Sequence, residues 1–332
     1  MRIETQTQQN ALKAQKFGVE IEFTNIFNVE AAEAIASFLG NGYQVNAFDS
    51  TIWEINDEYY RKWIITRDGS VSSSDYRKQC ELVTPILRYE DIPTLQEIVR
   101  ILRHKGAIST PEKTCGVHIH ISRIGHTPQT IRNLCNLMAA HQKQLIKAIN
   151  VDNERLNNYC KVIDPEFLQR LNTTKPKTWE KLGQIWYGDN NIQRHTESKY
   201  DRSRYHMLNL HNLWGGNGQT IEFRLFQFDN PHDDKKGGLH AGQLKSMIQL
   251  CLAMNQLAKQ SRSISPREQQ TENEAYAFRC WLLQLGFIGD EFKTARDYLM
   301  RNFSGDSAWR HGNTGSRQRR DIAESITNAI AI

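Results

Sequence analysis

The sequence predicts an α+β fold with a mainly antiparallel sheet, in which helices cover one face and the other face opens into a cleft. Three strand-like stretches support this class, at 18–23, 116–121 and 220–225, because each alternates polar and apolar residues. Strands of a parallel sheet that is covered on both sides are instead apolar throughout. The predicted strands also occur as hairpins or between helices, an arrangement typical of antiparallel sheets.

The first half of the chain alternates strands and helices. A helix over 30–39 follows the first strand and ends at Gly40-Asn41-Gly42, because glycine adopts the left-handed conformation that ends many helices. The helix at 91–105 has apolar residues three and four positions apart, which gives it one buried face. The remaining elements are a strand at 63–66, a turn at 67–70, strands at 80–85 and 116–122, and a helix at 128–149.

The second half begins with a polar stretch. We expect 152–203 to be an irregular lid or substrate-region insertion with one short helix at 178–186. The elements predicted after it are a strand at 205–213, a hairpin loop at 215–218, a strand at 219–228, a polar loop at 233–238, a helix at 239–259 and a helical portion at 268–302.

The domain organisation follows from these elements. Residues 1–12 are predicted to form a loose polar tail, 13–302 a single domain that holds the site, and 303–332 a basic C-terminal segment. Four arginines crowd this last segment, Arg310, Arg317, Arg319 and Arg320. They could cover an acidic ligand or form a solvated tail.

Composition narrows the class of protein. The net charge of +5 is too small for an obligate nucleic-acid binder. The chain has no run of 18 apolar residues, and its polar start lacks the core of a signal peptide. Its six cysteines are scattered without a CxxC pair, which favours reduced thiols. We therefore expect a cytoplasmic protein without a membrane partner.

Three pairs of polar residues carry the functional signal. Side chains two positions apart in a strand point to the same face. If the three strands share one sheet, all six groups converge on its open face. The pairs are Glu20 with Glu22, His118 with His120, and Glu222 with Arg224.

This set of groups favours divalent cations and a polyphosphate. Carboxylates are hard ligands that repel each other unless a cation bridges them, and the guanidinium fork of Arg224 suits phosphate. A solvated strand face, a Glu222–Arg224 ion pair and a zinc site at the two histidines are the alternatives. Zinc usually needs three or more His or Cys ligands. The sequence has no Walker loop, kinase glycine loop or GxGxxG motif, so a nucleotide would bind through metals and arginine.

Two further stretches add polar groups. Asp68-Gly69-Ser70 forms a turn, and Glu81 follows it as another inward carboxylate. In the strand at 205–213, Asn209 and His211 share one face, whereas His206 lies on the other. We expect Asn209 and His211 to face the cleft and Arg204 to reach in from the end of the strand.

Six motifs occur in order along the chain, GVEIEF, RDGS, CELVTP, CGVHIHIS, RYHMLNLH and TIEFRLF. Together they resemble the amidoligase family of the carboxylate–amine ligase superfamily, to which glutamine synthetase and glutamate–cysteine ligase belong. The resemblance spans about 17–255 and implies a curved sheet of the glutamine-synthetase catalytic type, with helices on its outer face. It also implies that ATP phosphorylates a carboxylate, that an amine then forms an amide, and that Mg²⁺ or Mn²⁺ neutralises the phosphoryl group.

The resemblance also implies roles for individual residues. The implied metal ligands are Glu20, Glu22, Glu81, His118 and Glu222. The predicted ATP-binding residues are His120 and Arg224, to which the strand analysis adds Arg204 and Asn209. The predicted catalytic residues are Arg224, Glu222 and His120.

The chain also departs from glutamine synthetase. That enzyme has a separate N-terminal domain that completes a neighbour's site, and this chain has no room for one before Glu20. We therefore expect a monomer or a small homo-oligomer. No ammonia-binding element is visible, so the amine is expected to be an amino acid, a peptide or a polyamine. A metal-dependent hydrolase and a binding protein with a degenerate site are the competing functions.

Overall fold

The structure is a computed structural model that describes residues 2–46, 49, 51–198, 201–215, 219–230, 238–268 and 270–309. Within these residues, eight strands form one sheet in the order β2-β3-β4-β5-β1-β6-β8-β7. Every neighbouring pair is antiparallel, which confirms the predicted α+β class. The strands are β1 (Phe17–Phe23), β2 (Tyr43–Val45), β3 (Trp53–Asn56), β4 (Lys62–Arg67), β5 (Cys80–Val83), β6 (Val117–Ser122), β7 (Leu208–Asn209) and β8 (Thr220–Phe226).

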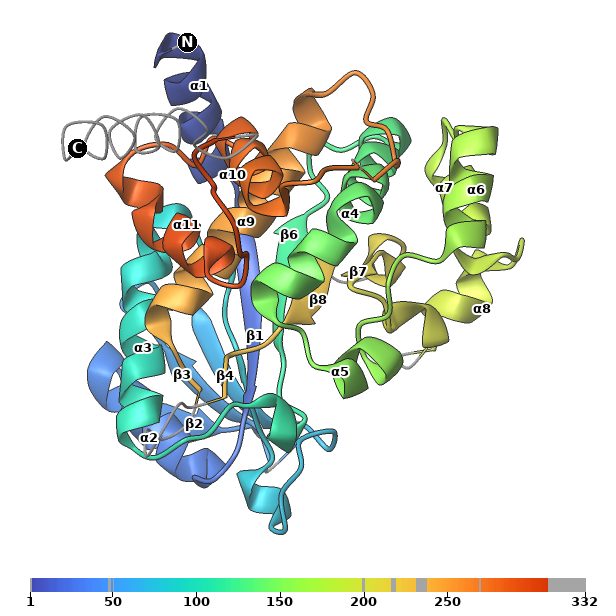
Figure 1. Cartoon of the computed structure of the whole chain (residues 1–332). Helices are drawn as coiled ribbons and strands as arrows, with labels where there is room; N and C mark the ends of the chain where they lie inside the picture. Colours follow the sequence, from blue (N-terminus) through green and yellow to red (C-terminus); the bar gives the residue numbers. More distant parts are fainter. Residues whose placement is uncertain are drawn as a thin grey trace, which may run out of the picture.

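Helices cover one face of this sheet. Figure 1 shows α4 and α9 crossing the central strands on one side, while α6, α7 and α8 stand beside the sheet. Helix α9 packs on β6, and α2 packs on β3 and β4. No described helix is both long and apolar enough to cross a membrane. The helices are α1 (Arg2–Lys13), α2 (Asn28–Leu39), α3 (Ile92–His104), α4 (Pro128–Ile149), α5 (Asn153–Asn158), α6 (Pro165–Thr174), α7 (Trp179–Tyr187), α8 (Ile192–Thr196), α9 (Ala241–Gln260), α10 (Glu274–Gln284) and α11 (Lys293–Met300).

The alternating strands form the core as predicted. Ile21 in β1, Ile119 in β6 and Phe223 in β8 are completely buried. They belong to one continuous hydrophobic cluster with the inner faces of the helices. The opposite side of the same strands therefore carries the polar residues.

The N-terminal residues differ from the prediction. They are polar but form α1 instead of a loose tail. Leu12 is completely buried, and the side-chain amides of Gln8 and Gln9 donate to the carbonyl oxygens of Gln284 and Gly286 at 2.8 and 3.0 Å. These distant contacts hold a helix whose local pattern is weak.

The insertion at 152–203 is mostly helical, although the sequence predicted irregular structure. Only α7 coincides with a predicted helix. The polar residues that suggest loops are helix caps, because each side chain accepts a hydrogen bond from a backbone N–H of the first turn. These caps are Asp152, Asp164, Thr178 and Asn191.

The predicted strand at 205–213 is also shorter in the structure. Strand β7 contains only two residues, because Asn209 Oδ1 accepts a hydrogen bond from the backbone N–H of His211 at 2.8 Å and the chain then turns into a 3₁₀ helix. Strands β2 and β3 were not predicted. The loops expected at 215–218 and 233–238, and the arginine cluster beyond 309, lie wholly or largely outside the described residues.

Candidate active site

Strand register brings the predicted polar residues together on the open face. In the antiparallel pairs, Glu20 lies opposite His118, Glu22 opposite Glu81, and His120 opposite Glu222. Directly opposed residues on one face have Cβ atoms about 4.5–5.5 Å apart. Four strands, β5, β1, β6 and β8, therefore contribute to one cluster.

His118 lies at the centre of this cluster. Its Nδ1 is 3.2 Å from Glu20 Oε2 and 3.5 Å from Glu222 Oε1, and its Nε2 is 3.6 Å from Glu22 Oε1. His120 Nε2 lies 3.2 Å from Glu20 Oε1. The predicted convergence of these side chains is thus present in the structure.

Two sets of side chains in this cluster could hold a divalent cation. The first is Glu20, His118 and Glu222, and the second is Glu22, Glu81 and His118. In each set the three ligand atoms lie within 4.8 Å of one another. Carboxylate oxygens dominate both sets, as magnesium and manganese prefer. The donor chemistry therefore fits the cation that the resemblance implies better than it fits structural zinc.

Opposite charges keep two of the carboxylates ionised. Burial disfavours a charged Glu20, yet its pKa stays well below the usual range because His120 and His118 lie beside it. Burial also opposes the ionisation of Glu222, but its pKa is lowered by Arg224 and by the histidines.

The neighbouring carboxylates instead raise the pKa values of Glu81 and His120. Burial, together with the neighbouring Glu20 and Glu22, raises the pKa of Glu81 well above its usual range. Burial would lower the pKa of His120, but Glu20 and Glu222 raise it to about 9. Without a bound cation, the cluster therefore favours charged Glu20, Glu222 and His120 and a protonated Glu81.

Both oxygens of Glu222 have partners. Arg224 Nη1 donates to Oε1 in a close ion pair, and Asn209 Nδ2 donates to Oε2 at 2.6 Å. Arg224 Nε also donates to the carbonyl oxygen of Tyr159 at 3.4 Å. The ion pair that the sequence left open as an alternative is therefore present, and it fixes the direction of the guanidinium.

Two cavities flank the cluster. The smaller one, of about 400 Å³, is polar and charged, and the larger one, of about 940 Å³, is mainly apolar. Glu20 lines both, so the carboxylates lie where the two meet. The smaller cavity is lined by Glu20, Glu22, Thr66, Arg67, Asp68, Gly69, Ser70, Glu81, Thr114, His118, Arg155, Tyr159, Arg204, Tyr205 and Arg224. The larger one includes Val83, Pro85, Ile86, His120, Ser122, Arg123, Ile124 and Trp179.

Most but not all of the predicted site residues line these cavities. Arg204 lines the smaller cavity, whereas His211 lines neither cavity and is buried, with Nδ1 2.9 Å from the hydroxyl of Tyr187. Asn209 is completely buried and supports Glu222. Arg155 and Tyr159 were not predicted, because both lie in the insertion and outside all of the motifs.

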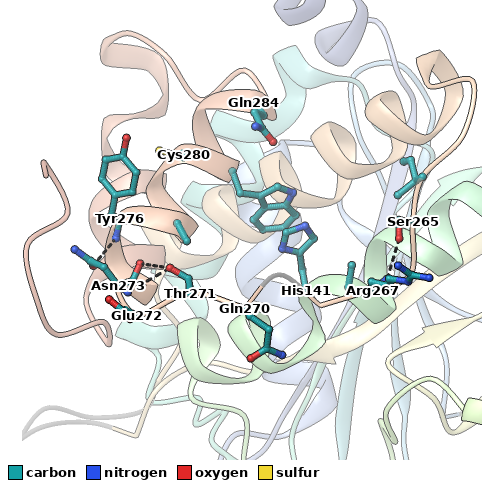
Figure 2. A pocket seen from close by; sticks show the side chains of 14 residues that line it. His141, Ser265, Arg267, Gln270, Thr271, Glu272, Asn273, Tyr276, Cys280 and Gln284 are labelled. Carbon is teal, nitrogen blue, oxygen red and sulfur yellow. Dashed lines mark hydrogen bonds between the residues drawn. The ribbon is translucent and has the colours of Figure 1, made fainter. Parts of the chain in front are cut away.

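A third cavity lies away from this cluster. It measures about 850 Å³, is lined by residues of α4, α10 and the segment before α10, and shares no lining residue with the other two. Figure 2 shows His141 among its polar side chains. The His141 ring stacks on Trp281 with the ring centroids 4.0 Å apart. This cavity lacks the carboxylate cluster.

Comparisons with known proteins bear on this site. A family model described as "Putative amidoligase enzyme" matches residues 13–255. Among solved structures, the crystal structure of a bifunctional glutathione synthetase from Pasteurella multocida is similar, with a TM-score of 0.48 and 12% sequence identity. The match covers 98% of this chain and 51% of that one, so this chain spans about half the length of that protein. No curated protein sequence matches the chain.

Proposed function

The chain belongs to the amidoligase family, and we propose that it is an ATP-dependent enzyme that joins a carboxylate to an amine through an acyl phosphate. One observation carries this proposal. Two carboxylate-rich sets share His118, and the guanidinium of Arg224 is held directly beside them. Phosphoryl transfer depends mainly on positioning and on neutralising charge, and this cluster offers the groups for both.

The metal ligands follow from the donor atoms. Mg²⁺ or Mn²⁺ would be held by Glu20, Glu22, Glu81, His118 and Glu222, from the two sets described above. When bound, the metal supplies positive charge to the phosphate oxygens. The surrounding protein supplies two further cations, Arg224 and His120, whose pKa values are both raised.

The two cavities suit different parts of the reaction. The larger cavity offers apolar side chains and Trp179, whose ring lies 4.5 Å from the guanidinium carbon of Arg123. A flat base fits such surroundings, so we assign the nucleoside of ATP to this side, with His120 at its phosphate end. The smaller, charged cavity would take the carboxylate and the amine, which places Arg204 on the substrate side.

The proposed reaction balances in two steps. An oxygen of the substrate carboxylate attacks the γ-phosphorus of ATP, the bond from that phosphorus to the β–γ bridging oxygen breaks, and ADP leaves. The amine then attacks the acyl carbon, and phosphate leaves with the carboxylate oxygen while the nitrogen loses a proton. Arg224 would stabilise the phosphoryl group as it transfers.

Oxygen labelling tests this sequence of steps. Amino acids, peptides and polyamines are first screened for ADP release, and the active carboxylate is then supplied with ¹⁸O. The released phosphate should carry the label and ADP should be the nucleotide product. Unlabelled phosphate, AMP as product or turnover without ATP would contradict the proposal, and the last of these would indicate a metal-dependent hydrolase.

A further inference from the structure

One buried arginine of the insertion is not used by the proposed reaction. Arg155 lies in α5, and only 2% of its surface is exposed. Among the described residues it forms no ion pair, and its Nε has no hydrogen-bond partner. A buried guanidinium is costly unless its contacts compensate, so its remaining contacts should explain why it is there.

Those contacts are with strand β8 at a bulge. Arg155 Nη2 donates to the carbonyl oxygens of Arg224 and Phe226, at 3.1 and 3.3 Å. The register with β6 shifts at this point, since Val117 lies opposite Phe226 whereas Ile119 lies opposite Phe223. A bulge disrupts the ladder locally and redirects a side chain. Arg155 thus supplies donors where the ladder is irregular, at the residue whose side chain holds Glu222.

The neighbouring strand leaves room for this guanidinium. A Cβ atom at Gly116 would lie 2.4 Å from Arg155 Nη2 and 2.5 Å from Nη1. The backbone N–H of Gly116 donates to Glu22 Oε2 at 2.6 Å. The guanidinium therefore lies between the backbone that binds Glu22 and the strand that carries Arg224.

The insertion also fixes Arg224 from a second direction. Asp152 precedes helix α5 and caps it with its side chain, and the backbone N–H of Asp152 donates to Gln227 Oε1 at 3.0 Å. At the end of α5, the carbonyl oxygen of Tyr159 accepts from Arg224 Nε. Both ends of this short helix are thus tied to β8 or to its continuation.

We propose that Arg155 is a positioning residue that holds the β8 bulge and so aims Arg224 at the transferring phosphoryl group. It acts through backbone carbonyls and need not touch the substrate. The catalytic part of this inference rests on the proposed function, whereas the effect on β8 does not. The insertion then has two tasks, to line the substrate cavity and to set the geometry of Arg224.

Four variants test this role. Arg155→Met removes the guanidinium, Arg155→Lys keeps the charge without the fork, and Gly116→Ala displaces the guanidinium while Arg155 stays. The double variant Arg155→Met/Gly116→Ala completes a double-mutant cycle. Arg170→Met is the matched control, because Arg170 is an exposed arginine of the same insertion, paired at 3.6 Å with Glu166.

The first measurement is amide hydrogen exchange of β8 without any ligand. Exchange at 222–227 should rise about tenfold in all four variants, as expected for the loss of a hydrogen bond to a charged group, with β1 little changed. The second is calorimetric binding of Mn²⁺–tripolyphosphate, which should change less than about twofold, because Arg224 is proposed to act on the phosphoryl group during its transfer. The third is kcat for ADP release, which should fall about tenfold while KM for ATP changes less than about twofold.

The double variant should lose no more than Arg155→Met, because Gly116→Ala acts only through the displaced guanidinium. Additive losses in the double variant would contradict this shared mechanism. Unchanged exchange in β8 would contradict the claim that Arg155 holds the bulge. Faster exchange with unchanged kcat would make Arg155 merely structural and overturn the proposal. If Arg155→Met fails to fold, the same measurements on Gly116→Ala and Arg155→Lys test the proposal. If the parent protein never turns over ATP, the proposed function fails, whereas hydrogen exchange still tests whether Arg155 holds β8.

Discussion

The two faces of the central sheet are chemically opposite, although the most buried residues of the polar face are almost as inaccessible as those of the apolar face. Ile21, Ile119 and Phe223 are completely buried on the helix-covered face. On the other face, Glu22 is 4% exposed and Glu222 is 1% exposed. Neighbouring residues of one strand thus meet either a hydrocarbon core or a set of charges. Burial alone therefore does not distinguish the part of this sheet that stabilises the fold from the part that we propose to be catalytic.

The difference lies in what compensates the burial. An apolar side chain gains free energy when it leaves water, whereas a buried carboxylate needs donors or cations. Glu22 has the N–H of Gly116, and Glu222 has Asn209 and Arg224. The charged face lowers the free energy of unfolding, and the apolar face raises it. Variants on the apolar face should therefore affect mainly stability, and variants on the charged face mainly turnover.

The sharpest separation is expected from Glu22→Gln. This change preserves shape but removes a charged ligand, so kcat should fall about 10³-fold, or about 4 kcal/mol in activation free energy. The free energy of unfolding without metal should stay the same or rise, because carboxylate repulsion decreases. Steady-state kinetics and urea unfolding measure the two quantities. Full activity at ordinary Mg²⁺ concentrations would refute a role for Glu22 in metal binding.

The adjacent residue should behave in the opposite way. Ile21→Ala leaves a cavity in the core and should lower the free energy of unfolding by about 3 kcal/mol. Turnover per folded molecule should remain within about twofold, because no cluster side chain changes. Equilibrium unfolding and active-site-normalised kinetics check this pair of outcomes. A decrease of less than about 1 kcal/mol in the free energy of unfolding would contradict the idea that the apolar face stabilises the fold much more than the polar face does.

Arg224→Lys keeps a positive charge on the polar face but loses the planar fork. We expect kcat to fall about 10²-fold, as for the loss of one preorganised donor, with little change in KM for ATP. Kinetics at saturating ATP and across a range of ATP concentrations separate the two parameters. If only KM changes, Arg224 anchors ATP in the ground state and does not act in the transition state.

A bound cation should compensate the repulsion between the buried carboxylates and so stabilise the protein. This is the smallest of the four expected effects. Mg²⁺ at ten times its Kd should raise the free energy of unfolding by about 1.4 kcal/mol, and Glu222→Gln should abolish this increase. Glu97→Gln is the control, since Glu97 is exposed and pairs with Arg100 on α3. Thermal unfolding with and without Mg²⁺ tests this. An equal increase in both variants would place the cation elsewhere.

Period-two alternation accounts for what the sequence could predict. It places Glu20 and Glu22 on one face and their apolar neighbours on the other, so the cluster follows once the strands pair. Local signals also define α4, which begins after the capping Thr127 and ends at Asn150 in the left-handed conformation. These elements depend on interactions between residues close together in the chain.

The elements that were not predicted depend on distant contacts. The edge strand β2 has only three residues, and all of them are exposed. Helix α1 depends on carbonyl groups near Gly286. The position of Arg155 depends on a bulge between β6 and β8, and the sequence of neither strand predicts this bulge. Polar residues in the insertion indicated loops because capping residues and loop residues are the same types.

Strand order has a consequence for how the chain acquires its structure. Strand β1 is made first but lies inside the sheet, between β5 and β6, and β6 pairs in turn with β8 from much later in the chain. Such non-local pairing slows folding, because long loops must close before the contacts form. During synthesis, β1 exposes two unpaired edges and an apolar face. The carboxylates of β1 cannot meet Glu222 until the ribosome has released β8, so a nascent chain truncated before β8 would lack the set formed by Glu20, His118 and Glu222.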